Sequence, residues 1–408
     1  MPKYAIHLFM PATVLLLSAI LIALPSTGAA AGSPAAGSPG APIIPAPPQL
    51  AAEGYLLLDA DTGRVLVEHN SKQRLPPASL TKIMTSYVAA EEIERGTLTE
   101  TEEVDVSVKA WRMEGSRMFI QEGTKVSVDQ LLKGIIIQSG NDASVAMAEH
   151  IAGGEDAFAD VMNQHAMRLG MSDTNFMNAT GLPDEDHYTT ASDLAKLTIA
   201  LINRHPEHYK LYSEKSFRYN EINQSNRNKL LWADRSVDGV KTGHTEAAGY
   251  CLVASAVRNN MRLISVVMGT KSEKARATES QKLLSYGFRY FETVRLYDAR
   301  EILNTVRLWN AEVSSVSMGL GEAVVITLPR GSKGSLSATM DVESVILGPI
   351  SAGQALGQLT VSMGDNVVYE GPLIALADIP EAGFFKRMWH SLSLFALQLF
   401  GGDPLKIP

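Results

Sequence analysis

The chain has 408 residues, of which 45% are hydrophobic and 20% are charged. This length favours two domains with additional segments, and the composition is typical of a folded globular protein. The formal net charge of -8 at pH 7 excludes a general attraction to nucleic acid, because proteins that bind it present a basic face. The only cysteine, Cys251, lies in an apolar run, so we expect a buried thiol, no intramolecular disulfide and no cysteine-based metal site.

The N-terminus has the pattern of an export signal. Lys3 and His7 precede an apolar stretch over residues 14–24, and small residues follow it. We therefore predict a signal peptide over residues 1–31, which places the rest of the chain outside the cytoplasm. An uncleaved N-terminal membrane helix is the alternative, because the apolar stretch is slightly long for a signal core. Residues 32–50 are rich in Ala, Gly, Ser and Pro and predict a linker.

Residues 51–292 predict an α+β domain. Apolar runs on both sides of a Gly-containing turn predict two strands at its start, and three more strands follow near its end. Helical periodicity predicts a mainly helical block between them. The strands are expected at 55–58, 64–67, 237–244, 249–257 and 262–269, and the helices at 79–94, 128–137, 142–151, 156–169, 192–204 and 272–291. This order predicts one antiparallel sheet, built from both ends of the domain, with helices packed on it.

The remaining residues predict a small all-β domain and a terminal helix. Short β runs punctuated by glycines extend over residues 293–380. Residues 381–408 form an amphipathic pattern that is short for a membrane span. Its apolar face consists of Phe384, Phe385, Met388, Trp389, Leu392, Phe395, Ala396, Leu399 and Phe400. We expect this helix to lie on a membrane surface; the alternative is a helix docked on the β domain.

Ser79 and Lys82 stand three residues apart at the start of the first predicted helix, so both side chains lie on one helix face. A serine hydroxyl becomes a strong nucleophile when a neighbour takes its proton. A lysine can do so when burial or a nearby cation lowers its pKa. The spacing alone is weak evidence, because a Ser-x-x-Lys match is expected about once or twice by chance in a chain of this size. A solvent-exposed helix start is the alternative interpretation.

Two further motifs carry polar side chains that suit a binding site. Ser139-Gly140-Asn141 lies between two predicted helices, where a hydroxyl and an amide project from a tight turn. A helix C-cap followed by an N-cap would give the same pattern. Lys241-Thr242-Gly243 lies on a predicted strand, where glycine lets a ligand approach the backbone closely. A strand edge protected by a lysine is the alternative.

The three motifs in this order are more specific than any one of them. Penicillin-binding proteins and class A β-lactamases carry Ser-x-x-Lys, Ser-Asp-Asn and Lys-Thr-Gly, and here glycine replaces the middle aspartate. From about Gly54 to the C-terminus, the chain closely resembles the low-molecular-mass penicillin-binding proteins that act as D-alanyl-D-alanine carboxypeptidases in Gram-negative envelopes. The resemblance includes residues 77–85, 138–143 and 238–245.

The resemblance implies a fold and a set of catalytic residues. The fold is a β-lactamase/transpeptidase-like domain followed by a small β-sandwich. Ser79 is implied to be the acylated nucleophile, Lys82 its base, and Ser139 the group that passes a proton toward the leaving amine. Neither a metal nor a cofactor is implied.

Further residues are implied to bind the substrate. They are Asn141, Arg227, Lys241, Thr242, Gly243 and His244. In this scheme Lys241 lowers the pKa of Lys82, and Arg227 binds the terminal carboxylate because a guanidinium can engage both of its oxygens. The backbone N–H groups of Ser79 and His244 form an oxyanion hole, a pair of donors aimed at the charge on the attacked carbonyl.

The resemblance also implies partners and a location. Peptidoglycan stem peptides are the expected substrates and β-lactams the expected covalent inhibitors, in a periplasmic protein that its C-terminal helix attaches to the inner membrane. A β-lactamase and a non-catalytic peptidoglycan-binding protein stay open as alternatives, although a binding protein does not need Lys82 or Lys241. A class A β-lactamase clears its ester with a glutamate that positions a water. Residues 179–189 hold acidic residues but no Glu-x-x-Leu-Asn arrangement.

Overall fold

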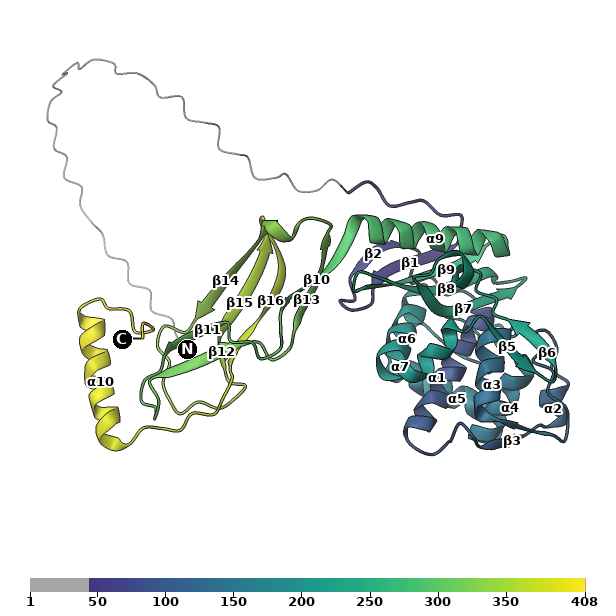
Figure 1. Ribbon diagram of the computed structural model, residues 1–408, viewed down its shortest axis with the longest axis horizontal. Coiled ribbons are helices and arrows are strands. Elements are labelled where there is room, and N and C mark those ends of the chain that lie inside the picture. Colours follow the sequence, from purple (N-terminus) through teal and green to yellow (C-terminus); the bar gives the residue numbers. More distant parts are fainter. Residues whose placement is uncertain (1–43, 408) are drawn as a thin grey trace, which may run out of the picture. The chain divides into compact units, whose positions relative to one another are not determined.

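The computed structural model describes residues 44–407 (Figure 1). The predicted signal peptide and the first part of the predicted linker lie outside the described residues. The described end of that linker is part of the first domain. Ile44 and Leu50 pack against a buried cluster of this domain, and the Tyr286 hydroxyl donates to the carbonyl oxygen of Pro45 at 2.9 Å. A free linker therefore does not extend as far as residue 50, contrary to the sequence-based expectation.

The first domain is built on a five-stranded sheet in the order β2-β1-β9-β8-β7. All of its neighbouring strands are antiparallel, and β1 from the start of the domain pairs with β9 from its end. The strands are β1 (Gly54–Asp59), β2 (Val65–His69), β7 (Val237–Thr245), β8 (Gly249–Arg258) and β9 (Met261–Thr270). The predicted sheet of both domain ends is confirmed. Strand β7 lies at the edge of the sheet, and its last residues, 242–245, border the cavity described below.

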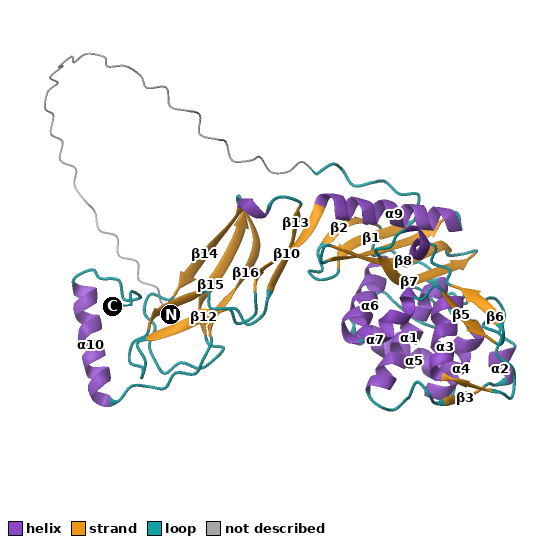
Figure 2. Cartoon of the chain, in the orientation of Figure 1, coloured by secondary structure: helices purple, strands orange, loops and turns teal. Residues whose placement is uncertain are grey.

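Helices cover both faces of this sheet (Figure 2). Side chains of β1 alternate between the faces, because successive residues of a strand point in opposite directions. Tyr55 and Leu57 pack in the cluster that includes Leu283 of α9 (Glu273–Tyr290), whereas Leu56 and Leu58 pack in the helical core. Cys251 is also buried in that core, as predicted.

The helical core is formed by five longer helices and several short elements. The longer helices are α1 (Lys82–Glu94), α3 (Val128–Lys133), α4 (Asn141–Ala152), α5 (Glu155–Arg168) and α6 (Ala191–Arg204). The short elements are α2 (Val108–Trp111), α7 (Pro206–Tyr209), and the ribbons β3 (Glu103–Asp105) with β4 (Lys125–Ser127) and β5 (Ser216–Tyr219) with β6 (Ile222–Ser225). The short helix α8 (Leu230–Ala233) packs instead in the cluster that includes α9. Every residue of α1 from 82 to 90 is buried, which is typical of a helix at the centre of a core.

The second domain is all-β, as predicted. A five-stranded antiparallel sheet has the order β11-β12-β16-β15-β14, and β10 pairs with β13. The strands are β10 (Phe291–Tyr297), β11 (Asn304–Arg307), β12 (Ser315–Gly319), β13 (Val324–Pro329), β14 (Leu336–Val342), β15 (Ala355–Met363) and β16 (Asn366–Ala375). The predicted terminal helix is α10 (Phe384–Leu399). Within residues 44–407, no helix has both the length and the apolar character needed to cross a membrane.

Candidate active site

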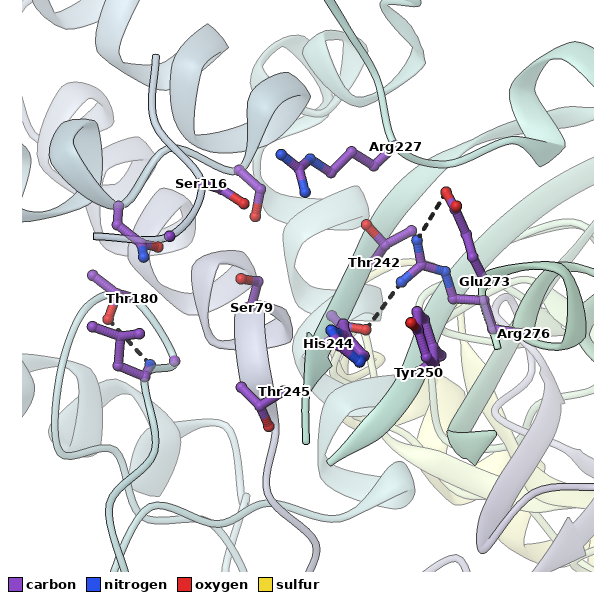
Figure 3. A pocket seen from close by; sticks show the side chains of 16 residues that line it. Ser79, Ser116, Thr180, Arg227, Thr242, His244, Thr245, Tyr250, Glu273 and Arg276 are labelled. Atoms are coloured by element: carbon purple, nitrogen blue, oxygen red, sulfur yellow. Dashed lines mark hydrogen bonds and ion pairs between the residues drawn. The ribbon is translucent and has the colours of Figure 1, made fainter. Parts of the chain in front are cut away.

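The residues predicted to form the site meet at one cavity of about 650 Å³ in the first domain. Strand β7, the start of α1 and the turn before α4 contribute to its wall. The predicted residues that line it are Ser79, Ser139, Asn141, Arg227, Thr242, Gly243 and His244. Lys82 and Lys241 are buried and contact the two serines. In the view of Figure 3, Ser79 lies between Arg227 on one side and Thr245 on the other.

A short helical turn places Ser79 beside Lys82. Residues Ala78–Thr81 form a 3-10 helix that continues into α1, so both side chains project together as the spacing predicts. Lys82 Nζ lies 3.2 Å from Ser79 Oγ. It also donates to Asn141 Oδ1 at 2.7 Å and to the carbonyl oxygen of Thr180 at 2.5 Å. A neutral amine has two N–H bonds for these two acceptors, which leaves its lone pair for the serine proton.

The environment of Lys82 favours the neutral amine. Burial, followed by the positive charge of Arg227, lowers the pKa of Lys82 to about 7. The nearby cation that adds to the effect of burial on Lys82 is Arg227. The two lysines also repel each other, because burial and the charge of Lys82 lower the pKa of Lys241 well below its usual value. Near pH 7 a large fraction of Lys82 can accept a proton.

Ser139 and Lys241 form a second pair of hydroxyl and amine. Lys241 Nζ donates to Ser139 Oγ at 2.9 Å and to the carbonyl oxygen of Thr242 at 3.1 Å. Ser139 has a φ of 66°, a left-handed conformation that residues other than glycine rarely adopt. It ends a π-helical segment, Gly134–Gln138, which replaces the last turn of the helix predicted over 128–137. Both features are common at functional sites.

Asn141 and Asp142 attach a neighbouring loop to this turn. Asn141 Nδ2 donates to the carbonyl oxygen of Glu114 at 2.6 Å, and the backbone N–H of Asn141 donates to the carbonyl oxygen of Ser116 at 2.6 Å. The buried Asp142 carboxylate accepts the N–H of Met118 at 2.9 Å. The loop thereby forms one wall of the cavity. Sequence reasoning did not find Asp142 as a site residue, because an acidic residue in the first turn of a helix is common and carries no specific signal.

Two glycines let the backbone segments around Ser79 approach one another. A Cβ at Gly243 would lie 3.0 Å from the carbonyl oxygen of Pro77. Gly181 has a φ of +83°, and a Cβ there would lie 1.8 Å from the carbonyl oxygen of Ala78. The glycine of the Lys-Thr-Gly motif therefore also accommodates a close approach of the chain's own backbone, in addition to the ligand contact that the sequence suggests.

Two arginines make one end of the cavity positive. Arg227 lines the cavity and forms no salt bridge with any residue in the described part of the chain. Arg276 is buried, donates to the carbonyl oxygen of Gly243 at 3.1 Å and lies 3.5 Å from Glu273. Arg227 is thus available to a carboxylate, whereas Arg276 supports β7. A single arginine inside a predicted helix gives no signal, which is why the sequence did not reveal Arg276.

Carboxylates are scarce around Ser79. Of the described residues, Glu273 is the acidic residue that lines the cavity, and it lies 3.2 Å from Lys229 and 3.5 Å from Arg276. The acidic residues at 184–186 are exposed and do not line this cavity. In residues 44–407, no group of His, Cys, Asp and Glu side chains could hold a metal ion.

Comparison with known families agrees with this geometry. Residues 41–272 match the family described as D-alanyl-D-alanine carboxypeptidase, which covers more than half of the chain and all of the predicted site residues. The chain belongs to the D-alanyl-D-alanine carboxypeptidase family. Residues 291–381 match the C-terminal domain of penicillin-binding protein 5. The D-alanyl-D-alanine carboxypeptidase DacC of Escherichia coli (strain K12) is 42% identical over 362 residues, which span 87% of this chain and 90% of the relative.

Solved structures of related proteins share the fold of this carboxypeptidase. Penicillin-binding protein 5 from Haemophilus influenzae is 40% identical, with a TM-score of 0.78 over 82% of this chain and 99% of that one. Penicillin-binding protein D2 from Listeria monocytogenes, solved in its ampicillin-bound form, is 30% identical, with a TM-score of 0.56 over 60% of this chain and 100% of that one. The family resemblance and the fold class predicted from the sequence are confirmed.

Proposed function

We propose that this carboxypeptidase removes the terminal D-alanine from peptidoglycan stem peptides through an ester on Ser79. The observation that carries the proposal is the buried Lys82 amine, which lies 3.2 Å from Ser79 Oγ and whose pKa is lowered to about 7. A neutral amine at this distance can act as the general base for the hydroxyl. Release of free D-alanine from a soluble pentapeptide by the purified protein tests this function.

The reaction has two steps. Lys82 takes the proton of Ser79 Oγ, which attacks the carbonyl carbon of the penultimate D-alanine, while the N–H groups of Ser79 and His244 stabilise the oxyanion. The peptide C–N bond then breaks as the proton that Lys82 took from Ser79 is passed by way of the Ser139 hydroxyl to the leaving amine, and free D-alanine departs. In the second step water hydrolyses the ester and restores the serine.

We assign recognition of the terminal carboxylate to Arg227. Its guanidinium is unpaired among the described residues and can bind both carboxylate oxygens. On β7, Thr242 lines the cavity and Lys241 donates to the Ser139 hydroxyl, and Gly243 lets this strand lie close to the turn that carries Ser79. The Asn141 amide, held by Lys82 and the neighbouring loop, is placed to contact the substrate backbone.

Replacement of Arg227 by Ala is expected to discriminate between two peptides. A lost charge-assisted contact costs about 1.5–3 kcal/mol, so kcat/KM for a peptide that ends in a free carboxylate should fall by roughly 10-fold to 150-fold. The kcat/KM for the corresponding peptide with a C-terminal amide should fall much less. Arg227→Lys keeps the charge without the two-pronged geometry and should give an intermediate loss. Equal losses for acid and amide would show that Arg227 does not bind the carboxylate.

The same chemistry accounts for inhibition by β-lactams. Attack of Ser79 on a β-lactam opens the ring and forms an ester. In a peptide the released amine departs, whereas in the opened β-lactam the corresponding nitrogen stays attached to the acyl group and continues to occupy the cavity. A β-lactamase is not favoured, because no unpaired carboxylate of the described residues lines the cavity to position a water for rapid hydrolysis. A non-catalytic binding protein is not favoured either, because it would not need a neutral, buried Lys82 beside Ser79.

We also propose that α10 attaches the protein peripherally to the periplasmic side of the inner membrane. The polar side of α10 is docked on the β domain, where Lys386 Nζ donates to the carbonyl oxygen of Glu312 at 2.7 Å and His390 Nδ1 accepts the N–H of Asn310 at 2.9 Å. The apolar side is exposed, with Phe384, Phe385, Met388, Trp389, Leu392, Phe395 and Leu399 each more than half accessible. A docked helix therefore still presents an apolar face that can enter a lipid interface.

The double substitution Leu392→Glu/Phe395→Glu is expected to release the protein from membranes. Burial of one such side chain contributes about 1.5–3 kcal/mol, so each change should weaken membrane partitioning by roughly 10-fold or more. The docking contacts of Lys386 and His390 are not altered. Ser351→Glu, at an exposed position of the β domain outside α10, is the matched control and should stay bound in vesicle sedimentation. Retention of the double variant would assign membrane attachment to another segment.

A further inference from the structure

Three arginines line a pocket to which both domains contribute. It has a volume of about 260 Å³ and shares no lining residue with the active-site cavity. The residues that line it are Arg258, Asn259, Ser285, Phe288, Arg289 and Arg330. Arg330 follows β13 of the β domain, whereas the others come from the end of β8, the turn after it and the last turns of α9. We call this space the arginine pocket.

Contacts with the protein hold two of the three guanidinium groups in place. Arg330 Nη2 donates to the carbonyl oxygens of Phe288 and Phe291, at 2.8 Å each. Arg258 Nη2 donates to Asp234 Oδ2 at 2.5 Å, and the guanidinium lies over the ring of Phe288. A guanidinium has five N–H donors, so both groups keep donors for a ligand. The bond from Arg330 also pairs a carbonyl oxygen at the negative end of α9, which reduces its repulsion of an anion.

The arginine pocket has an excess of positive charge. Asp234 offsets the charge of one guanidinium, whereas neither Arg289 nor Arg330 forms a salt bridge with a residue in the range 44–407. The Glu292 carboxylate accepts the N–H of Gly331 at 2.7 Å but does not line the pocket. Three guanidinium groups and one carboxylate leave a net charge of +2, in a chain whose formal net charge is -8. A bound anion relieves the repulsion between these cations.

The neutral polar groups of the pocket can also donate hydrogen bonds. Ser285 Oγ accepts an N–H of Gln281 at 3.4 Å, so the serine O–H is available to another acceptor. Asn259 adds a side-chain amide, and none of the described residues that line the pocket is acidic. A water needs only about 10–15 Å³ of such space, so a group of several atoms fits. Donors of this kind around a net positive charge suit an oxyanion.

We propose that the arginine pocket binds a phosphoryl group with two negative charges, either inorganic phosphate or a phosphate monoester. A phosphate monoester carries about -1.5 to -2 charges at pH 7 and has three strong acceptor oxygens, which matches the net charge and the three guanidinium groups. A carboxylate has one charge and leaves one cation unpaired. Because Arg330 belongs to the β domain, the bound group bridges the two domains. This site does not depend on the proposed carboxypeptidase function.

Calorimetric titration of the full protein, in phosphate-free buffer at constant ionic strength, tests the site with four probes. They are inorganic phosphate, methyl phosphate, dimethyl phosphate and acetate. Two unpaired guanidinium groups should give inorganic phosphate a Kd below about 1 mM. The singly charged dimethyl phosphate and acetate should bind at least about tenfold more weakly, because each leaves a charge-assisted contact unmade.

The variant Arg289→Gln should weaken phosphate binding by roughly 10-fold to 150-fold, through the loss of one charge-assisted contact. Arg289 is exposed and forms no salt bridge within residues 44–407, so the fold should persist, and unchanged labelling by a penicillin checks it. Arg168→Gln is the matched control. Arg168 is likewise an exposed arginine in the last turn of a helix, α5, and does not line the pocket, so its replacement should leave the Kd unchanged.

The probes also distinguish the two sources of the phosphoryl group. Equal affinity for methyl phosphate and inorganic phosphate would assign the site to a monoester at the end of a larger molecule. Binding of inorganic phosphate alone would assign it to the free ion. Three results would overturn the proposal: no saturable binding of phosphate to the wild-type protein, the same Kd for the wild-type protein and Arg289→Gln, or acetate and dimethyl phosphate bound as tightly as phosphate.

Discussion

Replacing Ser79 with Ala is expected to abolish covalent labelling by a fluorescent penicillin and to reduce D-alanine release by a factor on the order of 10⁶, the loss typical of removing a serine nucleophile. The change removes one oxygen that is partly exposed to the cavity, so the fold should persist. Lys82 would then have a neutral amine but no hydroxyl to activate. Labelling on a denaturing gel, with circular dichroism as the check on folding, measures the outcome.

Ser116→Ala is the matched control for this experiment. Ser116 lines the same cavity, but its hydroxyl has no hydrogen bond to Lys82 or Lys241 in the described structure. This variant should label at a rate close to that of the wild-type protein. Labelling of the Ser79 variant at the wild-type rate would show that the ester forms elsewhere and would exclude the arrangement of Ser79 and Lys82 as the reaction centre.

Replacing Lys82 with Met should slow acylation by about 10²-fold to 10⁴-fold, the usual contribution of a general base. Methionine keeps most of the buried volume and removes the amine, so lost packing is not the main effect. The neutral form of Lys82 is the base, and its pKa is about 7. Acylation by the wild-type protein should therefore fall tenfold per pH unit below about pH 7 and level off above it.

The Lys82→Met variant should not show the fall in acylation rate below about pH 7, because the titrating amine has been removed. Stopped-flow measurement of the second-order rate of acylation between pH 5 and pH 9 gives both results. A wild-type rate for Lys82→Met would mean that another group takes the proton. An unchanged pH profile in the slowed variant would mean that Lys82 has a structural role and that a different residue titrates.

Much of the first domain could be predicted because its signals are local. The strands at 237–244, 249–257 and 262–269 have continuous apolar runs, and the long helices have clear periodicity. Ser79 and Lys82 could be paired because three residues on a helix bring two side chains to one face. That this pair lies near Ser139 and Lys241 could be predicted only from the order of the three motifs. Ser139 and Lys241 are 102 positions apart, and no periodicity brings such residues together.

The features that the sequence did not reveal depend on tertiary contacts. The left-handed conformation of Ser139 and the π-helical segment before it result from packing, which no local propensity encodes. Arg276 belongs to the site only because the N-terminal turn of α9 lies beside β7 and Gly243 accepts its hydrogen bond. A second cavity, which shares Gly181, Leu182 and Thr245 with the active site, is lined by residues near positions 75, 182 and 247. Local sequence patterns do not predict such a cavity, because its lining residues are far apart in the chain.

The most direct test of the proposed function is single-turnover mass spectrometry of the intact protein with two acyl donors. With a penicillin, we expect a mass increase located on Ser79 that persists for minutes or longer. With a pentapeptide ending in D-alanyl-D-alanine, we expect one free D-alanine per turnover and an ester on the same residue that water hydrolyses promptly. A penicilloyl ester that disappears many times per second, with no D-alanine released from the pentapeptide, would contradict the account and identify a β-lactamase.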